Sequence, residues 1–210
     1  MARITTASCR QCRREGEKLF LKGAKCNTEK CAVMRREYAP GQHGLSSRRK
    51  KPSGYAIQLR EKQKAKRIYG ILEKQFKNYF KKAEKAKGAT GEVLLQLLER
   101  RLDNVVFRSC LAESRAAARQ IVDHKFVKVN GRKVNVPSYL ISEGDEITIT
   151  AKKEQAKRFV DNTKILEARG VPEWIEVSPE NLAIKIVRLP LKADSGLGIQ
   201  ENLIVELYSK

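Results

Sequence analysis

The chain has 210 residues, a hydrophobic fraction of 41%, few aromatic residues and a formal net charge of +20 at pH 7. This length accommodates one good hydrophobic core or two small ones. The sequence lacks the run of about 18 apolar residues that a membrane span needs, and its first residues lack the apolar segment of a secretory signal. We therefore expect a cytoplasmic protein whose thiols stay reduced.

The positive charge is concentrated in the first 90 residues, which carry a net charge of +18, against +2 for residues 91–210. Such an excess destabilises a compact chain by self-repulsion, and a bound polyanion relieves it. An anionic membrane is disfavoured because the basic segments lack the apolar face of an interfacial helix. The pattern favours nucleic acid, whose phosphates bind arrays of Lys and Arg, over a soluble basic protein without such a partner.

Residues 1–54 are predicted to form a loop-rich basic arm that carries four cysteines. Cys9, Cys12, Cys26 and Cys31 are spaced Cys-x2-Cys-x13-Cys-x4-Cys, which matches a closed four-thiolate zinc site. Metal binding would supply folding energy to a segment with almost no core. Neighbouring Lys and Arg would lower the thiol pKa values and offset the charge of the thiolates. An iron–sulfur cluster on the same ligands is the next alternative, and a disulfide pair is disfavoured.

The rest of the arm combines turn residues, cations and aromatic side chains. Four consecutive cations, Arg48 to Lys51, suit an extended segment along a phosphate backbone, and the interleaved aromatic rings suit stacking on unpaired bases. A basic tail that is disordered alone and orders on binding is the alternative. The residues of this segment that we predict to bind RNA are Arg35, Arg36, Tyr38, Gln42, His43, Arg48, Arg49, Lys50, Lys51 and Tyr55.

Residues 55–87 contain no proline, and their apolar residues recur mostly four apart. This period predicts two helices, or one long kinked helix, with a single apolar seam. The segment has 11 cations against 3 acidic residues, which favours phosphate contact over a solvated face. Among these cations, Arg60, Lys62 and Lys66 are predicted to bind RNA.

Two more helices are expected next, with Thr90 and Ser114 as their N-caps. The pattern then alternates, and Asn130-Gly131 predicts a β-hairpin whose return strand contains Val134 and Val136. A strand with Ile147 and Ile149 follows a turn. This helix–helix–hairpin–strand unit has a core small enough to favour binding over catalysis.

The last 60 residues have a less regular pattern. A helix is expected over 152–168, and Trp174 is expected in a core. Residues 181–190 and 202–209 are interpreted as strands or buried segments. We expect the final residues to pack on an earlier element.

Several segments, in order along the chain, resemble the family of bacterial small-subunit ribosomal protein number four. They are "REYAPGQHG", "SGYAIQLREKQKAKRIYGILEKQFKNYFKKA", "TGEVLLQLLERRLDNVVFRS" and "SRAAARQIVDHKFVKVNGRKVNVPSYLISEGD". The resemblance implies a non-enzymatic structural protein of the small subunit that binds 16S ribosomal RNA directly and nucleates assembly of the subunit body. It also implies contacts with neighbouring small-subunit proteins and with mRNA where it enters, and a contribution to translational accuracy. Neither a membrane nor a small-molecule substrate is expected as a partner.

Pattern and resemblance together predict an α+β fold with a metal-knot arm, a helical domain and a small helix–helix–β-hairpin RNA-binding module. The arm is expected over 1–45, the helical domain over 46–92 with 199–210 packed on it, and an α/β domain over 93–198. The module is expected at about 101–165. The resemblance places these of its residues on the RNA-facing side: Ser114, Arg115, Arg119, Asn130, Gly131, Arg132 and Lys133.

The sequence departs from the family at His124-Lys125-Phe126, where His-Gly-His is usual, so the helix must end without glycine. Cys110 stands where members often have glycine and is interpreted as a small packed residue. Some members hold four cysteines in the arm and others lack them, which implies a structural metal site.

The alternatives are an RNA-modifying enzyme, or its accessory, and a free translational repressor that uses the same module. Arg100 to Asp103 resembles a synthase motif with a catalytic aspartate. It precedes the module, however, and no large catalytic domain follows. Asp103 is therefore interpreted as a helix-end or salt-bridging residue.

Overall fold

The computed structural model describes residues 4–47, 51–150, 170–178 and 181–209. The chain forms two compact units, one from residues 1–91 with 197–210 and one from residues 92–196. The first is helical in its described residues, and the second combines helices with an antiparallel sheet, so the fold class is α+β. In these described ranges no helix is both long and apolar enough to span a bilayer.

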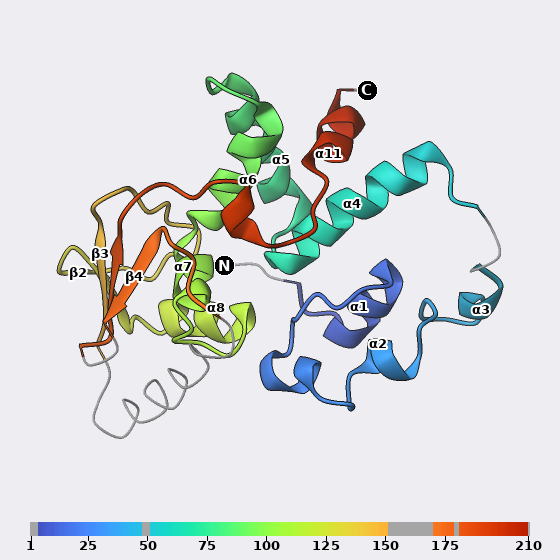
Figure 1. Cartoon of the computed structure of the whole chain (residues 1–210), viewed down its shortest axis with the longest axis horizontal. Coiled ribbons are helices and arrows are strands. Elements are labelled where there is room, and N and C mark those ends of the chain that lie inside the picture. Colours follow the sequence, from blue (N-terminus) through green and yellow to red (C-terminus); the bar gives the residue numbers. More distant parts are fainter. Residues whose placement is uncertain (1–3, 48–50, 151–169, 179–180, 210) are drawn as a thin grey trace. The chain divides into compact units, whose positions relative to one another are not determined.

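The first unit is built from short helices in the arm, two longer helices and a helix near the C-terminus (Figure 1). The second helix of the long pair turns its apolar face inward, where Phe76 and Phe80 stack against the ring of Tyr208. The elements are α1 (Ser8–Glu15), the 3-10 turn η1 (Gly23–Asn27), α2 (Ala32–Arg35), α3 (Gly44–Ser47), α4 (Gly54–Ile68), α5 (Glu73–Lys85) and α11 (Glu201–Tyr208).

The pair α4 and α5 matches the predicted two helices of residues 55–87. Ser53 caps α4, its Oγ accepting a hydrogen bond from the backbone N–H of Ala56. The break between the helices contains Gly70, whose φ of +65° suits glycine.

The arm is more helical than the sequence suggests. Cys9 and Cys12 lie on α1, Cys26 lies in η1, and Cys31 directly precedes α2. The segments between these short elements are loops, as expected, and the few apolar side chains of the arm include buried Leu19 and Val33.

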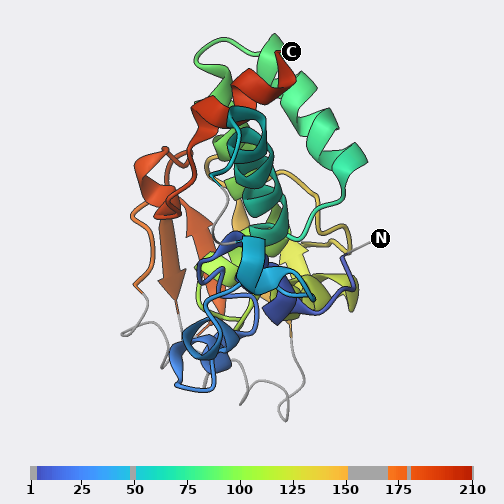
Figure 2. The same ribbon diagram turned by 90° about the vertical axis from the view of Figure 1, so that its right-hand side faces the viewer.

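Residues 202–209, interpreted as a strand or buried segment, form the helix α11. Their apolar residues fall at helical spacing, and Ile204 is fully buried. Helix α11 packs on α4, where Gln58 donates a hydrogen bond to Glu206 (Figure 1, Figure 2). The C-terminal segment thus returns to the first unit.

The second unit contains a sheet of five described strands in the order β2-β1-β3-β5-β4, with antiparallel pairing throughout. Strand β4 was not predicted, and the helix expected over 152–168 lies outside the described residues. The elements are α6 (Thr90–Glu99), α7 (Leu102–Arg108), α8 (Arg115–Asp123), β1 (Val127–Val129), β2 (Arg132–Lys133), β3 (Glu146–Ile149), β4 (Ile175–Ser178), β5 (Ala183–Ile186) and the 3-10 turn η2 (Ala193–Ser195).

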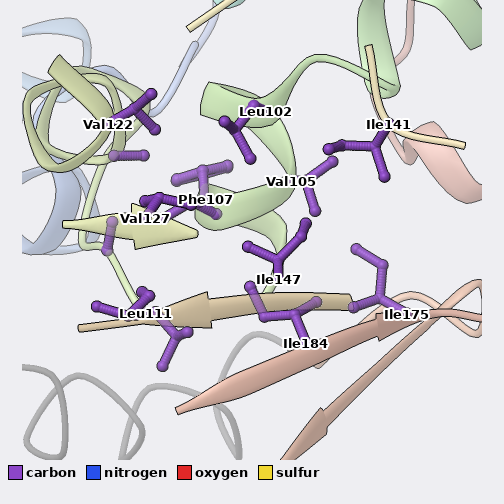
Figure 3. Close-up of a cluster of buried hydrophobic side chains, with 14 of the residues drawn as sticks. Leu102, Val105, Phe107, Leu111, Val122, Val127, Ile141, Ile147, Ile175 and Ile184 are labelled. Carbon is purple, nitrogen blue, oxygen red and sulfur yellow. The ribbon is translucent and has the colours of Figure 1, made fainter. Parts of the chain in front are cut away.

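The core of this unit lies between α7, α8 and the sheet (Figure 3). Val105 of α7 meets Ile147 and Ile184 from the central strands, and all three side chains are fully buried. Trp174 is 1% exposed and belongs to the same cluster, as predicted. This core holds the α7–α8 pair and the hairpin in fixed positions.

The hairpin has the predicted turn, since Asn130 and Gly131 both have positive φ values, of +48° and +78°. Its return strand β2 is shorter than expected and excludes Val134 and Val136. The N–H of Val134 still donates to the carbonyl of Val127 at 3.0 Å, and Pro137, which has no N–H, cannot extend this pairing.

The α8 helix ends in a motif that normally uses glycine. The N–H of Lys125 bonds to the carbonyl of Val122, and the N–H of Phe126 bonds to that of Ile121. This is the Schellman arrangement. It requires a left-handed residue at Lys125, whose φ is +63°, and such a conformation is unfavourable for a residue with a Cβ atom.

Lys125→Gly is therefore expected to raise the free energy of unfolding by about 1 kcal/mol. Gln120→Gly, at an exposed position inside the same helix, is the matched control and should lower it by about 1 kcal/mol. Urea denaturation of the full chain measures both. A Lys125→Gly variant that is less stable than the wild-type protein would show that the left-handed backbone at this position is not strained.

Candidate nucleic-acid interface and metal centre

The four cysteines of the arm surround one small cavity. Cys9, Cys12, Cys26 and Cys31 all line it, and its volume of about 20 Å³ accommodates one water-sized species. All four thiols are free, and three of them are buried. The two cysteine pairs, which are separated by 13 residues in the sequence, thus lie around one cavity in the structure.

The environment of the thiols disfavours negative charge on Cys12. Burial raises the pKa of the Cys12 thiol, a backbone hydrogen bond from Leu19 lowers it, and the nearby thiols of Cys26, Cys9 and Cys31 raise it further. The expectation that basic neighbours lower the thiol pKa is wrong for Cys12, because desolvation dominates. A bound cation would offset the repulsion among four clustered thiolates.

The donor set fits zinc, because four sulfur ligands are the usual shell of a structural zinc site. The backbone N–H of Lys22 donates to Cys26 Sγ at 3.3 Å, a contact that would orient a ligating sulfur. Among the described residues, however, no three His, Cys, Asp or Glu side chains are already arranged to hold a metal ion. The cysteines share a cavity without converging on a ligand geometry.

The arm is attached to α4 through two glutamates. Glu15, whose side chain is only 2% exposed, forms ion pairs with Arg67 and with Arg60, the latter at 3.4 Å. Burial raises the pKa of Glu15 even though these guanidinium groups pull it down. Glu17 lies 2.8 Å from the ammonium of buried Lys64. The cations of α4 thus form ion pairs with glutamates of the arm of the same chain.

A third glutamate neutralises the next pair of cations. Lys62 and Lys66 each donate a hydrogen bond of 2.9 Å to the carboxylate of Glu73, and the Tyr208 hydroxyl donates a third, of 3.0 Å. Burial raises the pKa of Glu73, but the lysine hydrogen bonds outweigh it and lower the pKa to about 2. Arg60, Lys62 and Lys66, all predicted to bind RNA, therefore already have acidic partners.

The arm residues predicted to bind RNA differ in accessibility. Tyr38 is half-buried beneath the guanidinium of Arg13, which lies 4.8 Å from its ring centre, so one face of this ring is occupied. Tyr55 is 59% exposed. Arg48, Arg49 and Lys50 lie outside the described residues. The remaining predicted residues are exposed: Arg35, Arg36, Gln42, His43 and Lys51.

On the module, two predicted residues have structural roles in the folded chain. Ser114 caps α8 by accepting a hydrogen bond from the N–H of Ala117 at 3.2 Å, as predicted. The side chain of Asn130 bonds to Asp145 and to the N–H of Glu146, which ties the hairpin to β3. These contacts position the hairpin turn.

The four module cations divide into two pairs. Arg119 is 5% exposed and lies 3.7 Å from Asp103, and Arg115 stacks on Phe107 at 4.3 Å. Arg132 and Lys133 extend from the exposed strand β2. Only the second pair presents its charges openly to a partner.

A buried polar network under the module was not foreseen from the sequence. Asp103 accepts two hydrogen bonds from fully buried Arg101 and so is the salt-bridging residue that we expected, at the start of α7. Buried Glu99 accepts hydrogen bonds from Arg108 and Asn104. The signal in the sequence is an acidic residue placed within an otherwise apolar helical run.

Comparisons with known proteins agree with this architecture. The family described as "Ribosomal protein S4/S9 N-terminal domain" matches residues 3–99, and the S4 domain matches residues 100–147. The fold and its hairpin module therefore define an S4-domain protein.

Full-length relatives narrow the assignment. Small ribosomal subunit protein uS4 of Acetivibrio thermocellus is 56% identical over 210 residues, uS4A of Symbiobacterium thermophilum is 55% identical, and uS4 of Thermodesulfovibrio yellowstonii is 55% identical. Each alignment covers 100% of both chains. The chain belongs to the uS4 family of small ribosomal subunit proteins, whose members carry the names of ribosomal proteins and not of enzymes.

The burial of Arg119 gives a test of its role. Arg119→Ala is expected to lower the free energy of unfolding by about 2 kcal/mol, because it removes a buried charged partner of Asp103. Arg132→Ala, on the exposed strand, should change it by less than about 0.5 kcal/mol. Equal stabilities of the two variants in urea denaturation would show that Arg119 has no structural role.

Proposed function

We propose that this protein is a structural, non-catalytic constituent of the small ribosomal subunit that binds 16S ribosomal RNA. The observation that carries the proposal is identity above 50% to small ribosomal subunit proteins along the entire chain, without truncation at either end of the alignment. The concentration of positive charge in residues 1–90 supports it independently, since ribosomal RNA is the polyanion of that assembly.

The RNA contacts are proposed for the accessible cations and rings. In the second unit, Arg132 and Lys133 project from β2 beside the fixed Asn130-Gly131 turn. In the arm, Arg35, Arg36 and Lys51 supply charge, while exposed Tyr55 offers a ring for stacking. Arginine forks and phosphates form paired hydrogen bonds, and such contacts position a protein on RNA without reading its sequence.

The assembly role follows from the same chemistry. A protein that contacts RNA from a rigid module and from a separate basic arm can hold two RNA segments together. We propose that it binds 16S RNA directly, nucleates folding of the subunit body, contacts neighbouring ribosomal proteins and lies near the path by which mRNA enters. A contribution to translational accuracy and a cytoplasmic, ribosome-bound location belong to this proposal.

The arm is proposed to hold one zinc ion on Cys9, Cys12, Cys26 and Cys31. The shared cavity, the free thiols and the backbone N–H donor to Cys26 support it. The thiols must converge to act as ligands, and metal binding would supply the energy for that ordering. An iron–sulfur cluster is the alternative occupant of the same thiolates.

The RNA proposal is tested by Arg132→Ala with Lys133→Ala. The variant should bind the 5′ part of 16S RNA more weakly, and the slope of log K against log salt should fall by about 2. Arg132→Lys with Lys133→Arg retains the charge and should retain the slope. Tagged wild-type protein should also sediment with small subunits from a cell lysate. Its absence from that fraction would overturn the proposed function.

The zinc proposal is tested by elemental analysis of the purified full chain. Cys9→Ser with Cys12→Ser should abolish bound metal and loosen the arm, while the second unit stays folded. Cys110→Ser is the control, because this fully buried cysteine belongs to the other unit and should leave the metal content unchanged. An equal metal content in all three proteins would refute the site. Spectra in the visible range distinguish iron–sulfur from zinc.

A further inference from the structure

One face of α5 carries lysines that have no acidic partner in the described residues. The ion pairs of α4 occupy Arg60, Lys62, Lys64, Lys66 and Arg67. In the described part of the chain, by contrast, no ion pair involves the exposed lysines of α5. We call them the lysine face; its members are Lys74, Lys77, Lys81, Lys82 and Lys85.

The packing of α5 fixes the direction of this face. Phe76, Tyr79, Phe80 and Ala83 are buried on the opposite side of the helix, two of them against Tyr208 of α11. Successive helical residues turn by about 100°, which places the remaining side of the helix toward solvent. Lys74, Lys81 and Lys85 fall along the centre of that side, with Lys77 and Lys82 flanking it.

The spacing of the central lysines suits a regular polyanion. With a rise of about 1.5 Å per residue, Lys74 and Lys85 lie about 16 Å apart along the helix axis. Long lysine side chains on a rigid rod can reach several successive phosphates. Because five like charges repel one another on one short helix, binding of an anion also reduces this electrostatic repulsion.

The composition of the face indicates how it recognises its partner. It contains no arginine for forked contacts and no aromatic ring for base stacking. Lysine ammonium groups act as point charges, so they bind phosphates without reading bases. The face also lacks the apolar residues by which a helix inserts into an anionic membrane.

We infer that the lysine face of α5 is a binding surface for the phosphate backbone of double-helical RNA, independent of its sequence. The inference rests on the proposed function and deepens it, since it adds a surface beyond the arm and the module. Paired RNA is favoured over unpaired strands because the face offers charge without a stacking platform.

The test uses full-length protein, the 5′ part of 16S RNA and an unrelated RNA hairpin duplex, with binding measured by fluorescence anisotropy over a range of KCl concentrations. Lys74→Gln, Lys81→Gln and Lys85→Gln are combined in one variant; Gln retains helix propensity. The salt slope should fall by about 3 on 16S RNA, and affinity for the duplex should fall as well. The matched triple Lys→Arg variant keeps the charge and should keep both.

The outcomes separate this inference from the proposed function. If wild type binds 16S RNA and the Gln variant has the same slope, the lysine face has no such role and the proposed function stands. An equal loss in the Arg variant also overturns the inference, because charge would not be the cause. Binding of the face to anionic phospholipid vesicles, with RNA binding unchanged, assigns it to a membrane instead. If the wild-type protein binds the duplex but not 16S RNA, the proposed function is overturned. The affinities of the variants for the duplex then still show whether the lysine face binds RNA.

Discussion

The folding of the first unit depends on a few glutamates placed within a large excess of positive charge. Glu15 and Glu17 join the arm to α4, and Glu73 joins α4 to α5 while accepting a hydrogen bond from Tyr208 of α11. Without these carboxylates, the cations of α4 would repel one another across each contact. The side chain of Glu15 is buried, and two guanidinium groups offset only part of its desolvation.

This arrangement divides the cations by role. Those of α4 are bound by acids of the same chain. Buried Arg101, which directly precedes α7, and buried Arg119 of α8 pair with Asp103 in the second unit. Among the described residues, the lysines of α5, the two cations of β2 and several exposed cations of the arm, such as Arg35 and Arg36, stay accessible to an external polyanion. The net charge of the chain therefore overestimates the number of cations that can bind RNA. Ion pairs within the fold determine which cations remain available to a partner.

The features predicted from the sequence are those with local causes. The Asn130-Gly131 turn, the Ser114 cap and the α4–α5 pair depend on neighbouring residues, and the structure has all three. Pairings between distant elements were missed, because no local pattern links Glu15 to Arg67 or Glu73 to Lys62. The resemblance implied an RNA-facing position for Arg119, yet its side chain is buried beside Asp103 of α7. Residues 202–209 were interpreted as a strand or a buried segment, because the period of such a short apolar run does not distinguish a strand from a helix.

Because α11 packs on α4, the two units can complete their folding in a fixed order during synthesis. Residues 92–196 are inserted, in sequence, between the two parts of the first unit. A ribosome adding about 5–20 residues per second would need roughly 6 to 24 s to make residues 92–210 after it has added residue 91. The inserted unit can complete its core during that interval, whereas α4 and α5 wait for their last partner. The highly charged first unit is therefore finished only after residues 197–210 have been made, when the second unit is already complete in sequence.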